Sequence, residues 1–193
     1  MTRVRNVLEI PVQRILDFDI ENRPLSYLGM DFTTSDITAI AASFGPEHEP
    51  DCWLLGPLGT IEILEEFRVM YDQADIVTGH YIRMHDLPII NGAMLELGLE
   101  PLSSKLTIDT KMDLKPFKGV SKSQESLADM LGVEFPKVHM TQAMWRDANR
   151  LTPEGIKATR ERVVGDVRQH QIMRIKLTER GALKPPKMWN GGR

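Results

Sequence analysis

Three acidic residues alternate along an apolar segment near the start of the chain. Asp17, Asp19 and Glu21 lie within LDFDIENRP, residues 16–24, and the residues between them are Phe and Ile. On a β-strand, alternate side chains share a face and their Cα atoms are about 6–7 Å apart, so the three carboxylates would point the same way. Carboxylates at this spacing can bind one divalent cation or bridge two; a solvated acidic face on an edge strand is the alternative.

Two further carboxylates occur at positions where an isolated charge would have to be stabilised by its surroundings. Asp86 comes just before Pro88, which is typical of the first turn of a helix, and the positive end of that helix would favour an ionised carboxylate. Asp166 lies among three valines in residues 163–167, and burying it is costly unless it is paired or bound to metal. Each could be only a cap or a boundary residue. Together with two carboxylates of the first strand, they form the kind of set that two hard cations require.

The hydrophobic pattern predicts the elements that would position these residues. Strands are predicted at 14–21, 26–33, 37–44, 76–80 and 105–110, with 52–56 as a further strand or an edge. Helices are predicted at 61–75, 87–99 and 123–133, and from Thr152 to about residue 180. Short connections make the first three strands antiparallel, and the later strands alternate with helices. We therefore expect an α/β domain with a mixed sheet and helices on both faces, covering residues 1–180 and followed by an irregular tail at 181–193.

The composition is that of an ordinary globular protein. The chain has 193 residues, of which 41% are hydrophobic and 26% charged. No apolar run approaches the ~20 residues that span a bilayer, and the first residues lack a signal-peptide core. The single cysteine, Cys52, excludes an intramolecular disulfide and a cysteine-rich zinc site. We expect a cytoplasmic protein without membrane association.

The charges are distributed unevenly along the chain. Residues 1–100 hold 6 Lys and Arg against 17 Asp and Glu, whereas residues 101–193 hold 18 against 10. An acidic half that attracts metal beside a basic half that attracts phosphate would explain this division. Chance patterning of solvated faces is the alternative.

Three segments resemble the motifs of the DEDD (DnaQ-like) 3′–5′ exonucleases, which have the ribonuclease H-like fold. They are ILDFDIENRPLSY, DIVTGHYIRMHDLPIINGAML and RVVGDVRQH. They occur in the family's order, and the resemblance covers about residues 14–180. It implies a two-metal mechanism, in which two Mg²⁺ or Mn²⁺ ions promote attack of water on the terminal phosphodiester and release a nucleoside 5′-monophosphate.

The resemblance also implies which residues bind the ions. By position in the motifs, the metal ligands would be Asp19, Glu21, Asp86 and Asp166. Asp17 has no counterpart among the ligands, so we expect it to support them or to face solvent. Asp109 is expected to be structural.

One position departs from the family pattern. The family has a Tyr four residues before the last Asp or a His five residues before it, and this chain has Arg162 and Glu161 there. Arginine stays protonated and cannot act as a base. It could still bind the phosphate or stabilise developing negative charge, so catalysis could be reduced or differently tuned. His170, one turn after Asp166, is expected on the helix surface more readily than at the site.

Three residues are candidates for binding the substrate. His80 matches a family His that shapes the pocket, and Tyr81 could either stack on a terminal base or pack internally. Lys122 ends a lysine-rich stretch, residues 111–122, that could follow a single-stranded phosphate backbone. Solvated loop lysines are the alternative.

These observations predict a 3′–5′ exonuclease that acts on single-stranded DNA, either alone or as a proofreading subunit of a replicative polymerase. RNA and short oligonucleotides are alternative substrates, because the metal chemistry does not depend on the 2′ position. A catalytically inactive nucleic-acid-binding module of the same fold is the rival hypothesis. Metal-dependent turnover would separate the two.

Overall fold

The structure is a computed structural model, and it describes residues 13–28, 31–135 and 138–191. The strands are β1 (Ile15–Leu28), β2 (Asp31–Ser43), β3 (Asp51–Leu54), β4 (Ile76–Gly79), β5 (Lys105–Asp109) and β6 (Lys187–Trp189). The helices are α1 (Thr60–Gln73), α2 (Asp86–Glu96), α3 (Thr110–Asp113), α4 (Gln124–Met130), α5 (Gln142–Asn149) and α6 (Pro153–Glu179). None of the helices in this described part is long and apolar enough to cross a membrane.

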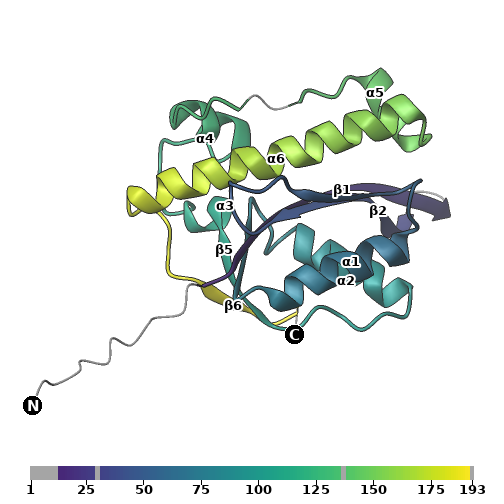
Figure 1. The fold of residues 1–193 in the computed structure, drawn as a ribbon, viewed down its shortest axis with the longest axis horizontal. Coiled ribbons are helices and arrows are strands. Elements are labelled where there is room, and N and C mark those ends of the chain that lie inside the picture. The colour runs from purple at the N-terminus through teal and green to yellow at the C-terminus, as the bar shows by residue number, and fades with distance from the viewer. Residues whose placement is uncertain (1–12, 29–30, 136–137, 192–193) are drawn as a thin grey trace, which may run out of the picture.

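The strands form one mixed sheet in the order β3-β2-β1-β4-β5-β6. β4 pairs in parallel with β1 and with β5, and the other neighbours are antiparallel. The long helix α6 crosses one face of the sheet and α1 and α2 cover the other, as Figure 1 shows. The predicted α/β architecture with helices on both faces is confirmed.

The antiparallel part of the sheet corrects the expectation of three successive strands at 14–21, 26–33 and 37–44. β1 and β2 form one long hairpin instead, and residues 29–30, in the middle of the second expected strand, lie outside the described residues. Register shifts after Glu21 and after Leu25 let β1 run through the segment NRP, which reads as a turn in the sequence. β3 is the third antiparallel strand.

The predicted long helix is confirmed. α6 has Thr152 as its N-cap, whose side chain accepts a hydrogen bond of 3.1 Å from Gly155 N. Three elements differ from the expectation. α3 and α5 were not predicted, and β6 pairs with β5, so the segment after residue 180 is not wholly irregular.

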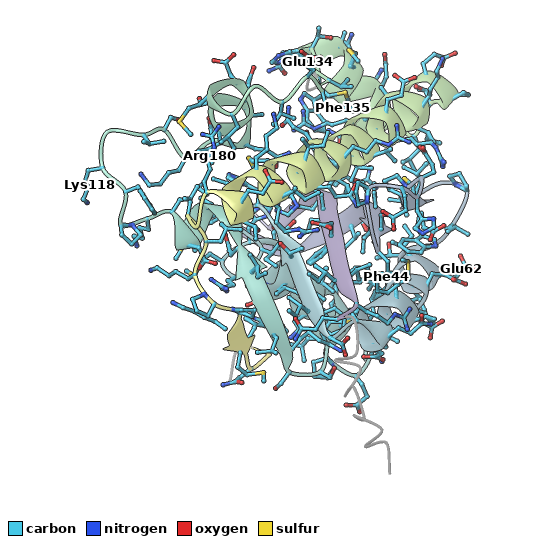
Figure 2. All side chains as sticks on the ribbon, turned by 60° about the vertical axis from the view of Figure 1, so that its left-hand side comes forward. Phe44, Glu62, Lys118, Glu134, Phe135 and Arg180 are labelled. Carbon is cyan, nitrogen blue, oxygen red and sulfur yellow. The ribbon has the colours of Figure 1, made fainter. Side chains whose placement is uncertain are left out.

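Alternation along β1 divides its side chains between the two faces of the sheet. Leu16, Phe18 and Ile20 are buried in the core that packs against α1 and α2. Asp19 and Glu21 pair across the hairpin with alanines of β2 that face Val163 and Val167 of α6. Small side chains there let a helix lie close to the sheet, so the carboxylates of β1 are brought under α6. Side chains fill the space on both sides of the sheet (Figure 2).

A close approach at the end of β4 requires glycine at position 79. A Cβ atom there would overlap Ile82 Cγ2 and lie 2.7 Å from the Phe18 carbonyl oxygen. We therefore expect Gly79→Ala to lower the free energy of unfolding by about 1–3 kcal/mol, as measured by urea denaturation. Gly92→Ala in α2 is the control, because nothing lies within 4 Å of its added methyl group. It should raise stability by about 0.5–1 kcal/mol. Equal stability of the two variants would contradict this account of the turn.

Candidate active site

Three carboxylates converge where β1 passes under α6. Asp19 and Glu21 from β1 and Asp166 from α6 each offer an oxygen atom, and these oxygens lie within 4.8 Å of one another. Glu21 and Asp166 are buried and Asp19 is partly buried. Carboxylate oxygens are the ligands of hard divalent cations, and buried carboxylates at this spacing need positive charge. The residues present therefore fit a divalent cation.

The three carboxylates lie in a cleft with a volume of about 360 Å³. The cleft brings together seven of the eight site residues named from the sequence: Asp19, Glu21, His80, Tyr81, Asp86, Arg162 and Asp166. The cleft is lined by residues from both the acidic half (1–100) and the basic half (101–193) of the chain. Asp166 and Arg162 come from the basic half.

Asp86 lines the cleft but is not one of the three clustered carboxylates. It is the first residue of α2 and is buried, and its Oδ2 lies 3.5 Å from His85 Nδ1. Burial raises the pKa of the Asp86 carboxyl, and the interaction with His85 only partly offsets this. The same interaction raises the pKa of the partly exposed His85 imidazole. The four expected ligands are therefore divided into a close group of three and a separate one, Asp86.

Arg162 lies against the carboxylate cluster. Its Nε atom donates a hydrogen bond to Glu21 Oε1, and its Nη2 atom lies 3.8 Å from Asp166 Oδ2. Burial alone would lower the pKa of the guanidinium, but the Glu21 and Asp166 carboxylates outweigh it and hold that pKa above its ordinary value. Arg162 is thus a permanent cation beside two of the clustered acids.

His80 shapes the wall of the cleft. Its Nδ1 atom lies 3.0 Å from Thr110 Oγ1 and its Nε2 atom 3.0 Å from the Lys122 carbonyl oxygen. The ring therefore links the end of β4 to the segment before α4. Lys122 is the one named site residue that does not line the cleft, because its ammonium group donates to the Val120 carbonyl oxygen at 3.0 Å. Lys118, in the same basic stretch, is exposed at the edge of the molecule (Figure 2).

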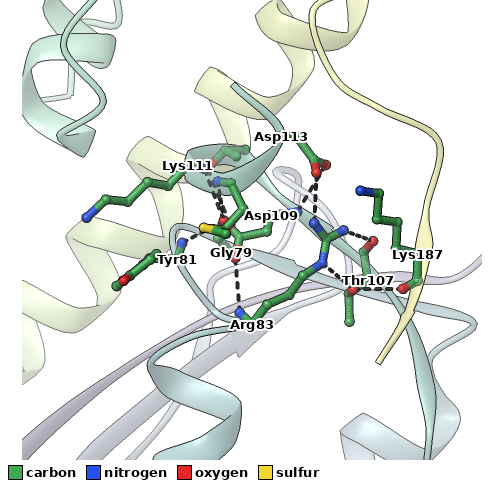
Figure 3. A network of polar contacts seen from close by, with 10 residues as sticks. Gly79, Tyr81, Arg83, Thr107, Asp109, Lys111, Asp113 and Lys187 are labelled. Atoms are coloured by element: carbon green, nitrogen blue, oxygen red, sulfur yellow. Dashed lines mark hydrogen bonds and ion pairs between the residues drawn. The ribbon is translucent and has the colours of Figure 1, made fainter. Parts of the chain in front are cut away.

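Asp109 holds the loop between β4 and α2 in place, as Figure 3 shows. Its carboxylate accepts hydrogen bonds from Tyr81 N at 3.1 Å and Arg83 N at 3.0 Å. It also caps α3 by accepting from Lys111 N at 3.1 Å and Met112 N at 2.9 Å. The interactions agree with the structural role expected for Asp109.

Tyr81 has an unusual backbone conformation at the edge of the cleft. Its φ angle is +78°, a left-handed conformation that is uncommon for a bulky residue and is often associated with functional sites. The Lys111 ammonium lies 4.0 Å from the centre of the Tyr81 ring, and both residues line the cleft. An aromatic ring and a cation are thus presented together on the wall of the cleft, and Figure 3 shows the two side chains near one another.

Asp17 lies outside the cleft and links β1 to α6. Arg174 donates two hydrogen bonds of 2.8 Å to its two oxygens, and His170 Nδ1 lies 3.1 Å from Oδ1. Asp17 is fully buried, so it does not face solvent. Burial opposes its ionisation, but His170 and Arg174 outweigh this and lower the pKa of its carboxyl. The surface position expected for His170 is wrong, because its side chain is 2% exposed.

Several residues of the site were not identified from the sequence. Gln124 is buried and donates a hydrogen bond of 2.9 Å to the Asp166 carbonyl oxygen, and Trp145 lies under the Arg162 guanidinium. No local pattern signals either contact. Lys111 belongs to the lysine-rich stretch that was identified from the sequence, although Lys122 was chosen from it. His85 was not assigned a site role, and its position beside Asp86 is the only signal that the sequence offers.

The fold is similar to part of a DNA polymerase of known structure. The structure of the family B DNA polymerase from the hyperthermophilic archaeon Pyrobaculum calidifontis matches 87% of this chain with a TM-score of 0.70 and 16% sequence identity. The match covers 25% of the polymerase, so this chain spans about a quarter of its length. The sequence matches no protein-family model and no curated protein. The structural similarity and the mixed six-stranded sheet together show that the chain has a ribonuclease H-like α/β fold.

Proposed function

We propose that the protein is a divalent-metal-dependent 3′–5′ exonuclease that shortens single-stranded DNA and releases nucleoside 5′-monophosphates. The observation that carries the proposal is the convergence of Asp19, Glu21 and Asp166 in one open cleft. The similarity of the fold to part of a DNA polymerase supports nucleic acid as the substrate. A replicative polymerase is a candidate partner for such an enzyme.

We propose that Asp19, Glu21, Asp166 and Asp86, which all line the same cleft, together bind two ions. Mg²⁺ or Mn²⁺ would suit these oxygen ligands. Divalent cations bound there would acidify a water for attack on the phosphodiester and stabilise the departing oxygen. The supporting observations are the mutual distances of the three carboxylates and the place of Asp86 on the cleft wall.

The remaining residues of the cleft would bind and orient the nucleic acid. Tyr81 can stack on a base, a contact worth about 1–3 kcal/mol, and the Lys111 ammonium beside its ring can pair with a phosphate. We assign to Lys111 the phosphate contact expected from Lys122, because Lys111 is the one that lines the cleft. Arg162 can stabilise negative charge that develops on the phosphate.

A non-catalytic binding module of the same fold is the second candidate. It is favoured by Arg162, because no general base occupies that position. It is disfavoured by the retention of all four carboxylates around the cleft. RNA is the alternative substrate for either candidate.

The proposal can be tested with a time course on single-stranded DNA and RNA of matched sequence, each labelled at the 5′ end. Reactions contain Mg²⁺, Mn²⁺ or a chelator. We expect a ladder that shortens from the 3′ end, requires the metal and yields nucleoside 5′-monophosphates. Faster shortening of DNA than of RNA would support the proposed substrate. Binding of either nucleic acid without cleavage under both metals would instead support the binding module.

A further inference from the structure

One guanidinium group engages two of the three clustered carboxylates. Arg162 Nε donates to Glu21 Oε1, and Arg162 Nη2 lies 3.8 Å from Asp166 Oδ2. The side chains of Arg162, Glu21 and Asp166 are 18%, 11% and 4% exposed. Water therefore screens these charges only weakly. Any cation that uses Glu21 and Asp166 together must displace the guanidinium or share the two acids with it.

The position of Arg162 is also supported from the side away from the carboxylates. Its Nη1 atom donates a hydrogen bond of 3.1 Å to the Val138 carbonyl oxygen. Its Cζ atom lies 5.2 Å from the centre of the Trp145 ring, within the range of a cation–π contact. These contacts come from α5 and the segment before it, so the acids are not the only groups that hold the guanidinium. Because arginine does not lose its proton in proteins, only movement of the side chain can release the two acids.

The charges around Arg162 allow for one divalent ion. Three ionised carboxylates and one guanidinium have a combined charge of minus two, which a single divalent cation neutralises. A second ion needs additional negative ligands. Asp86 is the remaining acid that lines the cleft, but it lies outside the close group of three carboxylates.

We propose that Arg162 is a built-in competitor of the second metal ion. In the resting protein, the guanidinium neutralises part of the negative charge of Glu21 and Asp166, and the second ion requires that charge. The first ion therefore binds tightly and the second binds weakly until Arg162 moves. This inference rests on the proposed function for the identity of the ligand, a divalent cation at the clustered carboxylates, and it makes Arg162 a regulator of that site.

The test is calorimetric titration of the whole chain with MnCl₂ in the absence of nucleic acid. Arg162→Gln removes the charge, and Arg162→Met removes it without adding a possible metal ligand. Arg160→Gln is the matched control, because Arg160 is an exposed arginine on α6 that does not line the cleft. Circular dichroism of each variant shows that it is folded.

The wild type and Arg160→Gln should bind one Mn²⁺ tightly and a second at least about tenfold more weakly. Both Arg162 variants should bind the second ion about tenfold or more tightly than the wild type does. An unchanged affinity for the second ion in both folded Arg162 variants would overturn the proposal. If no form of the protein binds Mn²⁺, the metal centre itself is rejected along with it. Normal Mn²⁺ binding without any DNA cleavage would reject the exonuclease alone.

Discussion

Asp166→Asn should reduce metal-dependent hydrolysis by at least about 1,000-fold and leave the domain folded. Asp166 belongs to the close group of three carboxylates and lies over β1 because α6 crosses the sheet there. Charge stabilisation by a bound metal contributes several kcal/mol to such reactions, and each 1.36 kcal/mol corresponds to a factor of ten in rate. The measurement is the initial rate of 3′-end shortening in Mg²⁺.

A control on the same helix separates loss of a ligand from a general change of charge. Glu161→Gln also removes one carboxylate from α6, but Glu161 is exposed and does not line the cleft. It should keep the wild-type rate. An Asp166→Asn protein that unfolds at the same urea concentration as the wild type and still cleaves at the wild-type rate would rule out the assigned site.

Asp17→Asn should lower the free energy of unfolding by about 3–5 kcal/mol, the usual cost of removing one partner from a buried ion pair. Asp17 is fully buried, and its carboxylate is the shared partner of Arg174 and His170. The substitution would leave the Arg174 guanidinium, which is only 12% exposed, without its bidentate partner. Urea denaturation at neutral pH measures the difference.

Asp129→Asn is the control for this second variant, because Asp129 is an exposed aspartate on α4. Its effect should stay within about 0.5 kcal/mol of zero. Equal stabilities of Asp17→Asn and the wild type would show that the buried cluster does not stabilise the fold.

The effect of Asp17→Asn should also depend on pH. Contacts with His170 and Arg174 overcome the effect of burial and place the folded-state pKa of Asp17 below its ordinary value of about 3.8. Stability from a carboxylate with a lowered pKa is fully present above the ordinary pKa and is lost as the pH falls through the folded-state pKa. The difference between the variant and the wild type should therefore shrink below about pH 4.

The local pattern of β1 was sufficient to predict which of its side chains are buried against α1 and α2 and which belong to the carboxylate cluster. Alternation is a property of the strand itself, so the separation of Phe18 from Asp19 did not require knowledge of the partner strands. The N-terminal cap of α6 was predictable for the same reason, because Thr152 and Pro153 act within the first turn.

Features that depend on distant contacts were not predictable in this way. The strand β1 continues through NRP because β2 pairs with it across shifts in register. His170 is buried because Asp17, more than 150 residues earlier in the sequence, lies against it. Trp145 reaches Arg162 through α5, a helix whose apolar pattern is too short to identify.

The separation of Asp86 from the three clustered carboxylates is a further example. The motif order places all four acids around one cleft, and the structure agrees. The depth of Asp86 at the start of α2, however, depends on how the loop from Gly79 to His85 is held. That loop is fixed by hydrogen bonds to Asp109 and by the ion pair of Arg83 with Asp113.

The most direct test of the central claim is a side-by-side measurement of 3′-end shortening by the wild type and Asp166→Asn, purified in the same way, in Mg²⁺, Mn²⁺ and chelator. A ladder that needs the metal and is lost in the variant would attribute the hydrolysis to the three carboxylates of β1 and α6. Equal rates for the two proteins, or a wild-type rate unchanged by chelator, would contradict the proposed metal-dependent site.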